Sequence, residues 1–455
     1  MTSEETPLDA ALRGLARGRP LARVLEVWRP QAWLELDARI RRGIRTGEVG
    51  RPAPRRLPTG GLPSALRAAL GAPAPSEAQL ALALCDPSGL IRAAALPHAA
   101  GRPAVLPLVA IRTADWAAPV REAAQAVLAG ALPGADPGTL AVTAPVALRL
   151  GARLRGGTAA ALLRDTLRTA PPATVTGLLL NRDRPTRRLA LDLAIERGLL
   201  GPAELARLAA YDDDRVVRDR AATAALAAGV PDETLPLLLA ARCGGVRSAG
   251  VTALRKAGRT AEAEPFLHDR SGLVRACARW ALRQDGRDPA ALYRAACADP
   301  ATVPDRAPLG LAECGERTVD LPVLWELTGH ERPLVRSSAV AGLRVLGTGD
   351  LARLLALLDD PAPGVVREAA RTLLPWTDRL PDRELVRRTG PDRPAHTRIR
   401  ALRLLSERGG EPYGETARRL LEDPDPVLRG QVRRALGLGN PRVRPPGTPA
   451  RFLIR

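Results

Sequence analysis

The sequence predicts an all-α fold, an α-solenoid of about 11–12 helical-hairpin repeats. Three observations support this prediction: a motif that recurs about every thirty residues, a composition dominated by leucine and alanine, and an aromatic content of only 2%. Few aromatic residues disfavour a β-sandwich or barrel, whereas leucine and alanine favour closely packed helices. With 455 residues, of which 45% are hydrophobic, the chain can bury a large core.

The N-terminal segment differs from the rest of the chain. Residues 7–17 and 20–46 have amphipathic spacing, and we expect one helix in each. Because tandem arrays need atypical ends to cover their terminal apolar face, we predict that residues 1–46 form a helical cap. Tethering of a partner is the alternative. Residues 47–62 are rich in Pro, Gly and Arg and are typical of a linker.

A repeated motif defines the predicted array, residues 63–439. An Asp is followed by two apolar residues, by an Arg six positions after the Asp, and by a small residue three positions later. Clear copies begin at Asp86, Asp115, Asp212, Asp269 and Asp423. From the middle of the chain onward, the repeated arginines are 28 to 31 residues apart: Arg188, Arg218, Arg247, Arg275, Arg306, Arg336, Arg367, Arg398 and Arg429.

Each repeat is expected to contain two short helices. Val274, Ala278 and Ala281 show the apolar spacing of one helical face, which predicts a second helix after the turn. A run such as Asp350–Leu358, which begins with a good N-cap, predicts a first helix before the turn. Two short helices cannot bury their apolar faces alone, so neighbouring repeats must stack.

Two segments depart from the pattern. The interval between Arg121 and Arg188 is long enough for two repeats but is rich in Gly and Pro, so we expect one poorly formed or enlarged repeat there. The copy at Asp299 contains Pro304 and Pro308, and the latter would remove a hydrogen bond if it lay inside the second helix.

The repeat sequences resemble those of a known class. Segments such as DPSGLIRAAAL, DDDRVVRDRAATAAL and DRSGLVRACARWAL are similar to HEAT repeats, and specifically to the short HEAT-like repeats named after phycobilisome lyases. The resemblance covers about residues 76–438. It implies that the turn Asp and the second-helix Arg form a ladder of bonds between neighbouring repeats.

The ladder has a simple physical interpretation. The Asp can cap the positive end of the second helix, while the Arg can bond that Asp or carbonyls of the preceding repeat. Binding of a polyanion by exposed arginines is the alternative. The predicted structural ladder comprises Asp86, Arg92, Asp115, Arg121, Asp212, Arg218, Asp269, Arg275, Arg336, Arg367, Asp423 and Arg429.

The net charge of +19 is concentrated at the two ends. Residues 1–60 hold 12 Arg against 7 acidic residues, and residues 427–455 hold 7 Arg and no acidic residue. The predicted basic, Pro-rich tail spans residues 440–455. We therefore expect a polyanion, if one binds, to contact the ends. The candidate contacts are Arg39, Arg41, Arg42, Arg45, Arg442, Arg444, Arg451 and Arg455.

Motifs for catalysis are missing from the sequence. It contains no GxSxG, GxxxxGK[ST] or HExxH motif, and the pair His330–Glu331 is too sparse for the two-iron site of HEAT-like hydroxylases. The five cysteines form no CxxC pair, so a zinc ribbon and a disulfide framework are not indicated. We expect no catalytic residue, no cofactor and no metal.

These observations predict a non-enzymatic, monomeric scaffold in the cytoplasm that presents a curved helical surface to a protein partner. The first alternative is a nucleic-acid-binding solenoid that uses its basic ends. The second is a lyase-like or hydroxylase-like enzyme of the HEAT-like class. We expect no membrane span, since no apolar stretch is long enough, and no signal peptide.

Overall fold

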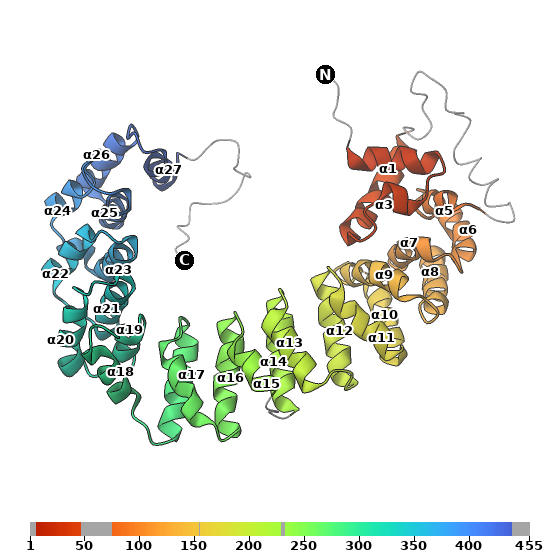
Figure 1. Ribbon diagram of the computed structural model, residues 1–455. Helices are drawn as coiled ribbons and strands as arrows, with labels where there is room; N and C mark the ends of the chain where they lie inside the picture. The colour runs from red at the N-terminus through yellow and green to blue at the C-terminus, as the bar shows by residue number, and fades with distance from the viewer. Residues whose placement is uncertain (1–5, 47–74, 154, 229–232, 439–455) are drawn as a thin grey trace. The chain divides into compact units, whose positions relative to one another are not determined.

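The computed structural model describes residues 6–46, 75–153, 155–228 and 233–438, and within these ranges the regular structure is entirely helical (Figure 1). The predicted all-α fold is confirmed. No helix in the described ranges combines the length and the apolar character that a membrane crossing requires. The linker predicted at 47–62 and the tail predicted at 440–455, with its four arginines, lie outside the described residues.

The chain divides into two compact units, residues 1–241 and 242–455. In the first unit, helices adjacent in sequence pack as hairpins, and second helices also contact one another, as α6 with α8 and α12 with α14. The helices of this unit are α1 Pro7–Ala16, α2 Leu21–Val24, α3 Pro30–Arg45, α5 Glu77–Leu84, α6 Gly89–Ala99, η1 Pro103–Val105, α7 Leu106–Arg112, α8 Ala118–Ala131, α9 Pro137–Leu150, α10 Gly157–Thr169, α11 Pro172–Gly177, η2 Leu178–Leu180, α12 Arg184–Glu196, α13 Pro202–Tyr211, α14 Arg215–Ala227 and α15 Thr234–Leu239.

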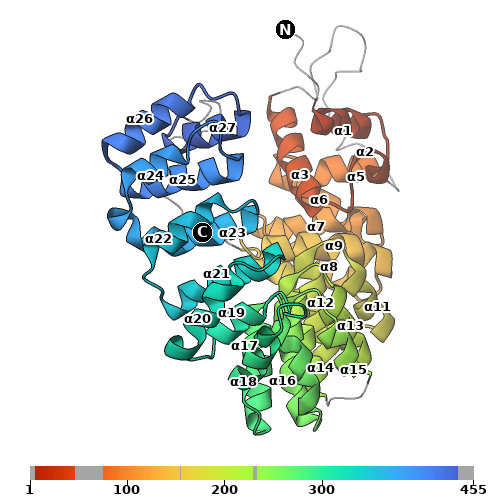
Figure 2. The same cartoon turned by 60° about the vertical axis from the view of Figure 1, so that its left-hand side comes forward.

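The second unit repeats the same arrangement. Successive second helices are in contact, as α19 with α21, α21 with α23 and α23 with α25, and their hairpins follow one another along the unit (Figure 2). The helices of this unit are α16 Gly244–Lys256, η3 Thr260–His268, α17 Gly272–Gln284, α18 Pro289–Ala298, α19 Ala307–Ala312, α20 Arg317–Leu327, α21 Pro333–Leu346, α22 Leu351–Ala356, η4 Leu357–Asp359, α23 Pro363–Leu373, η5 Leu374–Arg379, α24 Asp382–Arg387, α25 Ala395–Arg408, α26 Gly410–Leu420 and α27 Pro426–Ala435.

The core lies between the two layers of helices. Val274, Ala278 and Ala281 of α17 are fully buried, as their helical spacing predicts. Small residues at these positions let neighbouring helices approach closely. The first helix predicted at 350–358 is present as α22 and η4, and Asp350 caps it by accepting a hydrogen bond from the Arg353 N–H at 3.1 Å.

The N-terminal helices pack against the first repeats, α1 against α5, and α3 against α7 and α9. The expectation of one helix over 20–46 is wrong, because the chain leaves α2 after Val24 and restarts at Pro30. Proline is favoured in the first turn of a helix, where its missing N–H is not needed. A buried ion pair between Arg112 and Asp37 (2.6 Å) connects α7 to α3.

The two irregular segments are also helical. Residues 134–172, where we expected a poorly formed or enlarged repeat, contain α9 and α10, which are 14 and 13 residues long. Pro308 lies in the first turn of α19 and removes no internal hydrogen bond there, contrary to the concern from sequence. However, α19 has only six residues, less than half the length of α21.

The turn Asp does not cap the second helix directly, which corrects our expectation. Its side chain accepts a hydrogen bond from the backbone N–H two residues later, as Asp86 does from Ser88 and Asp269 from Ser271, both at 2.7 Å. In both repeats this serine is the N-cap. The carboxylate therefore forms an Asx-turn that fixes the entry into the helix, rather than satisfying the N–H groups of the first helical turn.

The second-helix Arg has two partners. It donates to the carbonyl of its own turn residue, as Arg92 does to Asp86 (2.7 Å) and Arg336 to His330 (2.9 Å). Where the next turn carries a carboxylate, the same Arg also donates two hydrogen bonds to it, as Arg92 does to Asp115 at 2.9 Å. The bond to the Arg's own turn residue is as expected, although the backbone carbonyl accepts it. The bond between repeats runs forward to the following turn, whereas we expected it to run back to carbonyls of the preceding repeat.

Other ladder residues vary around this scheme. Arg247, Arg336 and Arg398 bond the next turn carboxylate, and Arg275 bonds Glu313 instead of a turn Asp. Arg121, Arg218 and Arg429 bond the carbonyl of their own turn residue, and none of them has an ion pair with a carboxylate of the next turn in the described structure. These bonds keep the ladder arginines engaged inside the protein.

Two assignments from the sequence were wrong. The ladder position near the start of α12 is held by Arg187, which donates to the Asn181 carbonyl at 2.9 Å, and not by Arg188, which bonds Asp214. Arg367 is 54% exposed and lies 3.5 Å from Glu368, so it takes no part in the ladder. Its copy of the motif places Arg seven residues after the turn Asp, which moves its side chain off the ladder side of the helix.

A substitution of Arg336 tests the ladder. Arg336→Ala should lower the free energy of unfolding by about 3 kcal/mol, because it leaves the buried Asp360 carboxylate without its cation. Arg367→Ala is the matched control and should change it by less than about 0.5 kcal/mol. Urea denaturation measures both, and equal effects would contradict the ladder.

Asp214 provides a test by pH. Hydrogen bonds from Arg188, the largest cause, lower the pKa of Asp214 to about 2, and the side chain also caps α14 by accepting from the N–H of Val216 and Val217. Because the folded pKa lies below the unfolded value, the stabilisation is complete above about pH 4 and is lost toward about pH 2.

Asp214→Ala should therefore cost about 1–2 kcal/mol near pH 7 and progressively less as the pH falls below about 4. Urea denaturation of both proteins at several pH values measures this difference. A cost that stays constant down to about pH 3 would show that the carboxylate charge makes no contribution.

Candidate functional site

The charges of the second unit are segregated between its two layers. Its second helices, α16, α17, α19, α21, α23, α25 and α27, carry seventeen Arg or Lys residues and only two acidic residues. Its first helices, η3, α18, α20, α22, η4, α24 and α26, carry seven basic and nine acidic residues. We call the second helices of this unit the basic layer.

Only part of this charge is neutralised within the fold. The ladder arginines of the basic layer, such as Arg275 and Arg336, are paired with carboxylates. The side chains of Arg283 and Arg433, in contrast, are exposed and make no hydrogen bond or ion pair with a described residue. A charged residue that the fold does not use for its own packing can serve an external ligand.

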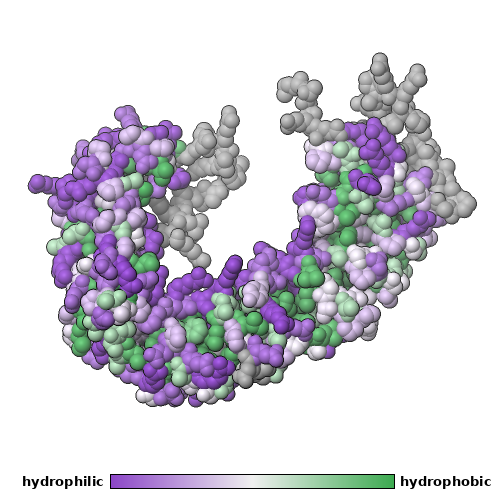
Figure 3. Space-filling view, in the orientation of Figure 1, coloured by the Kyte–Doolittle hydropathy of each residue, from purple (hydrophilic) through white to green (hydrophobic). Residues whose placement is uncertain are grey.

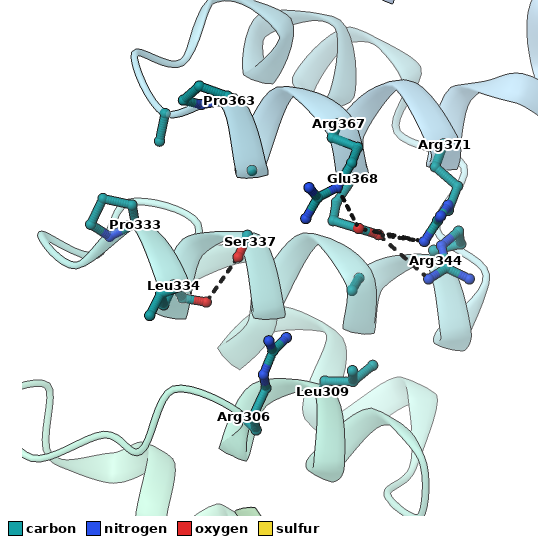
Figure 4. A pocket seen from close by; sticks show the side chains of 13 residues that line it. Arg306, Leu309, Pro333, Leu334, Ser337, Arg344, Pro363, Arg367, Glu368 and Arg371 are labelled. Atoms are coloured by element: carbon teal, nitrogen blue, oxygen red, sulfur yellow. Dashed lines mark hydrogen bonds and ion pairs between the residues drawn. The ribbon is translucent and has the colours of Figure 1, made fainter. Parts of the chain in front are cut away.

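A groove crosses the basic layer at three successive helices, α19, α21 and α23 (Figure 4). It has a volume of about 520 Å³, and hydrophilic residues cover much of the visible surface over these helices (Figure 3). Figure 4 shows Arg306 pointing from the start of α19 toward α21. The groove is lined by Arg306, Leu309, Pro333, Leu334, Ser337, Ala341, Arg344, Ala362, Pro363, Gly364, Arg367, Glu368 and Arg371.

Glu368 is the only acidic residue of this groove, and three arginines surround it (Figure 4). Its carboxylate lies 3.5 Å from Arg367, 3.5 Å from Arg371 and 3.6 Å from Arg344. The Glu368 side chain is 11% exposed, whereas those of the three arginines are 36% to 57% exposed. The arginines therefore present their outer N–H groups to solvent.

Arg400, on the neighbouring helix α25, adds a fourth cation to this group. Its side chain is half-buried and makes no hydrogen bond with a described residue. Burial, and then repulsion by Arg403, Arg367 and Arg371, lowers the pKa of Arg400, although a guanidinium remains charged at neutral pH. We call Arg344, Arg367, Arg371 and Arg400 the arginine cluster.

The polyanion contacts predicted near the N-terminus are only partly available. Arg39 donates to Asp9 at 2.7 Å, and Arg41 bonds Asp37 at 3.1 Å, so both are engaged within the first unit. Arg42 and Arg45 are exposed at the end of α3. The other candidates, Arg442, Arg444, Arg451 and Arg455, lie outside the described residues.

His330, whose pairing with Glu331 we judged too sparse for a metal site, has a structural role. Its Nε2 lies 2.7 Å from the Pro300 carbonyl, and its Nδ1 accepts a hydrogen bond from the Arg332 N–H at 3.0 Å. It thus replaces the turn Asp of the other repeats. In the described part of the chain, no three His, Cys, Asp or Glu side chains form a group that could hold a metal ion.

The comparisons with known proteins indicate only a general likeness. No protein-family model matches the sequence, and no curated protein is significantly similar to it. The chain is similar in structure to a microtubule polymerase with TOG domain arrays, at 13% identity and a TM-score of 0.24, covering 73% of this chain and 91% of the other. It is also similar to Kap121p, solved in complex with Pho4p, at 13% identity and a TM-score of 0.23, covering 95% of this chain and 44% of Kap121p.

Proposed function

We propose that this chain is a non-enzymatic scaffold of the HEAT-like class that binds an acidic segment of a protein partner on its basic layer. The observation that carries this proposal is the segregation of charge in the second unit. Its second helices carry seventeen basic residues and only two acidic ones. Complementary charge favours an acidic partner and speeds its association.

The arrangement of the layer also suits an extended chain. Each repeat adds one second helix beside the last, so cations recur at the helical-repeat spacing along the row. The groove over α19, α21 and α23 offers apolar positions such as Leu309 and Leu334 beside the arginines. An acidic segment can thus bury apolar side chains between its ionic contacts, which gives affinity that charge alone does not.

Neutralising the basic layer tests the proposal. A variant with four arginines of the layer changed to Gln (Arg283, Arg344, Arg403 and Arg433) should bind a fluorescein-labelled decapeptide of alternating Asp and Gly about tenfold more weakly than the wild type. The reason is the loss of four exposed cations, none of which belongs to the ladder. Fluorescence anisotropy at about 0.1 M salt measures the affinity.

A matched variant controls for net charge. Four exposed arginines outside the layer, Arg164, Arg207, Arg383 and Arg418, are changed to Gln in the same way. This variant should lose less than about twofold in affinity for the peptide. Equal losses in the two variants would show that the attraction follows total charge, and would refute binding on the basic layer.

A further inference from the structure

The positive charge of the arginine cluster is only partly neutralised by carboxylates of the described protein. Three guanidinium groups from α21 and α23 lie around one carboxylate, that of Glu368. The guanidinium group of Arg400, on α25, is near enough to Arg367 and Arg371 to be repelled by them. The distances of 3.5 Å and 3.6 Å from this carboxylate to its arginines exceed the roughly 2.7–2.9 Å of a strong charge-assisted hydrogen bond. Glu368 therefore holds the arginines near one another without satisfying them.

The environment of the Arg400 side chain is a second indication of an anion site. A half-buried guanidinium without a hydrogen-bond partner in the described protein loses part of its hydration and gains no bond in exchange. Repulsion from Arg367 and Arg371 adds to this cost. An anion bound between α23 and α25 would relieve both penalties, so the site is prepared for a ligand with more than one negative charge.

We infer that the arginine cluster binds a phosphoryl group on the acidic segment of the protein partner, an inference that rests on the proposed function. A phosphorylated side chain carries nearly two negative charges and three acceptor oxygens, whereas a carboxylate carries one charge and two oxygens. Planar guanidinium groups match phosphate oxygens in paired hydrogen bonds. Guanidinium groups that arrive from three helices can surround such a group on several sides.

The surroundings favour a phosphorylated peptide over a nucleic acid. The groove next to the cluster is lined by Leu309, Pro333 and Leu334, which suit aliphatic side chains of a peptide. No aromatic residue lines it, so it offers no platform on which bases could stack.

Peptide binding distinguishes a phosphoryl group from a carboxylate. Three labelled peptides share the alternating Asp and Gly sequence and carry phosphoserine, Glu or Ser at the centre. The wild-type chain should bind the phosphoserine peptide about tenfold more tightly than the Glu peptide, because only the phosphoryl group satisfies the cluster. In the double variant Arg371→Gln/Arg400→Gln this ratio should fall to about twofold or less.

The control variant Arg283→Gln/Arg433→Gln removes the same charge from the same layer. It should weaken both peptides alike and preserve the ratio. Melting temperatures of both variants should stay near the wild-type value, since none of the four arginines belongs to the ladder.

The outcomes separate this inference from the proposed function. Equal binding of the phosphoserine and Glu peptides by the wild type would overturn the phosphoryl site while leaving the acidic-segment scaffold in place. A phosphoserine preference that survives in Arg371→Gln/Arg400→Gln would also overturn it. Binding of a single-stranded RNA, but of none of the peptides, would overturn both the inference and the proposed function.

Discussion

The arginine that joins many of the second helices to the turn of the next repeat is the interaction on which the repeat stack depends. In its most buried form, Arg92 donates two hydrogen bonds of 2.9 Å to Asp115, and the two side chains are 0% and 1% exposed. A buried charge is stable only when it is paired, so a repeat with this bond requires the turn of the following one. Ala241, six residues before Arg247, stands at the turn position of its repeat, and the ladder has no carboxylate there.

This structural use of arginine determines which cations can meet a partner. Ladder arginines donate hydrogen bonds to the carbonyls of the turn residues, as Arg275 and Arg336 do, and are therefore engaged within the repeat stack. Arginines farther along the second helices, such as Arg344 and Arg371, take no part in the ladder, and their side chains are 36% and 57% exposed. Since stacking places the second helices side by side, these remaining charges collect in one layer, where the second helices of the second unit carry only two acidic residues.

The repeat period and helical spacing were sufficient to predict the fold, since both follow from local sequence. The direction of the ladder bond was not, because it depends on which turn lies within reach of the guanidinium. Arg187 could have been found by counting six residues from Asn181, and the basic layer by summing charges helix by helix. The crowding around Arg400 could not, because it arises from the packing of α23 against α25.

Hydrogen exchange of the chain, with and without a saturating acidic peptide, tests most directly whether the basic layer is the binding surface. Bound peptide should slow exchange in α21, α23 and α25, because backbone opening in these helices would then require release of the ligand. The first helices α20, α22 and α24 should change much less. Protection confined to the first unit, or spread evenly over the whole chain, would contradict the account.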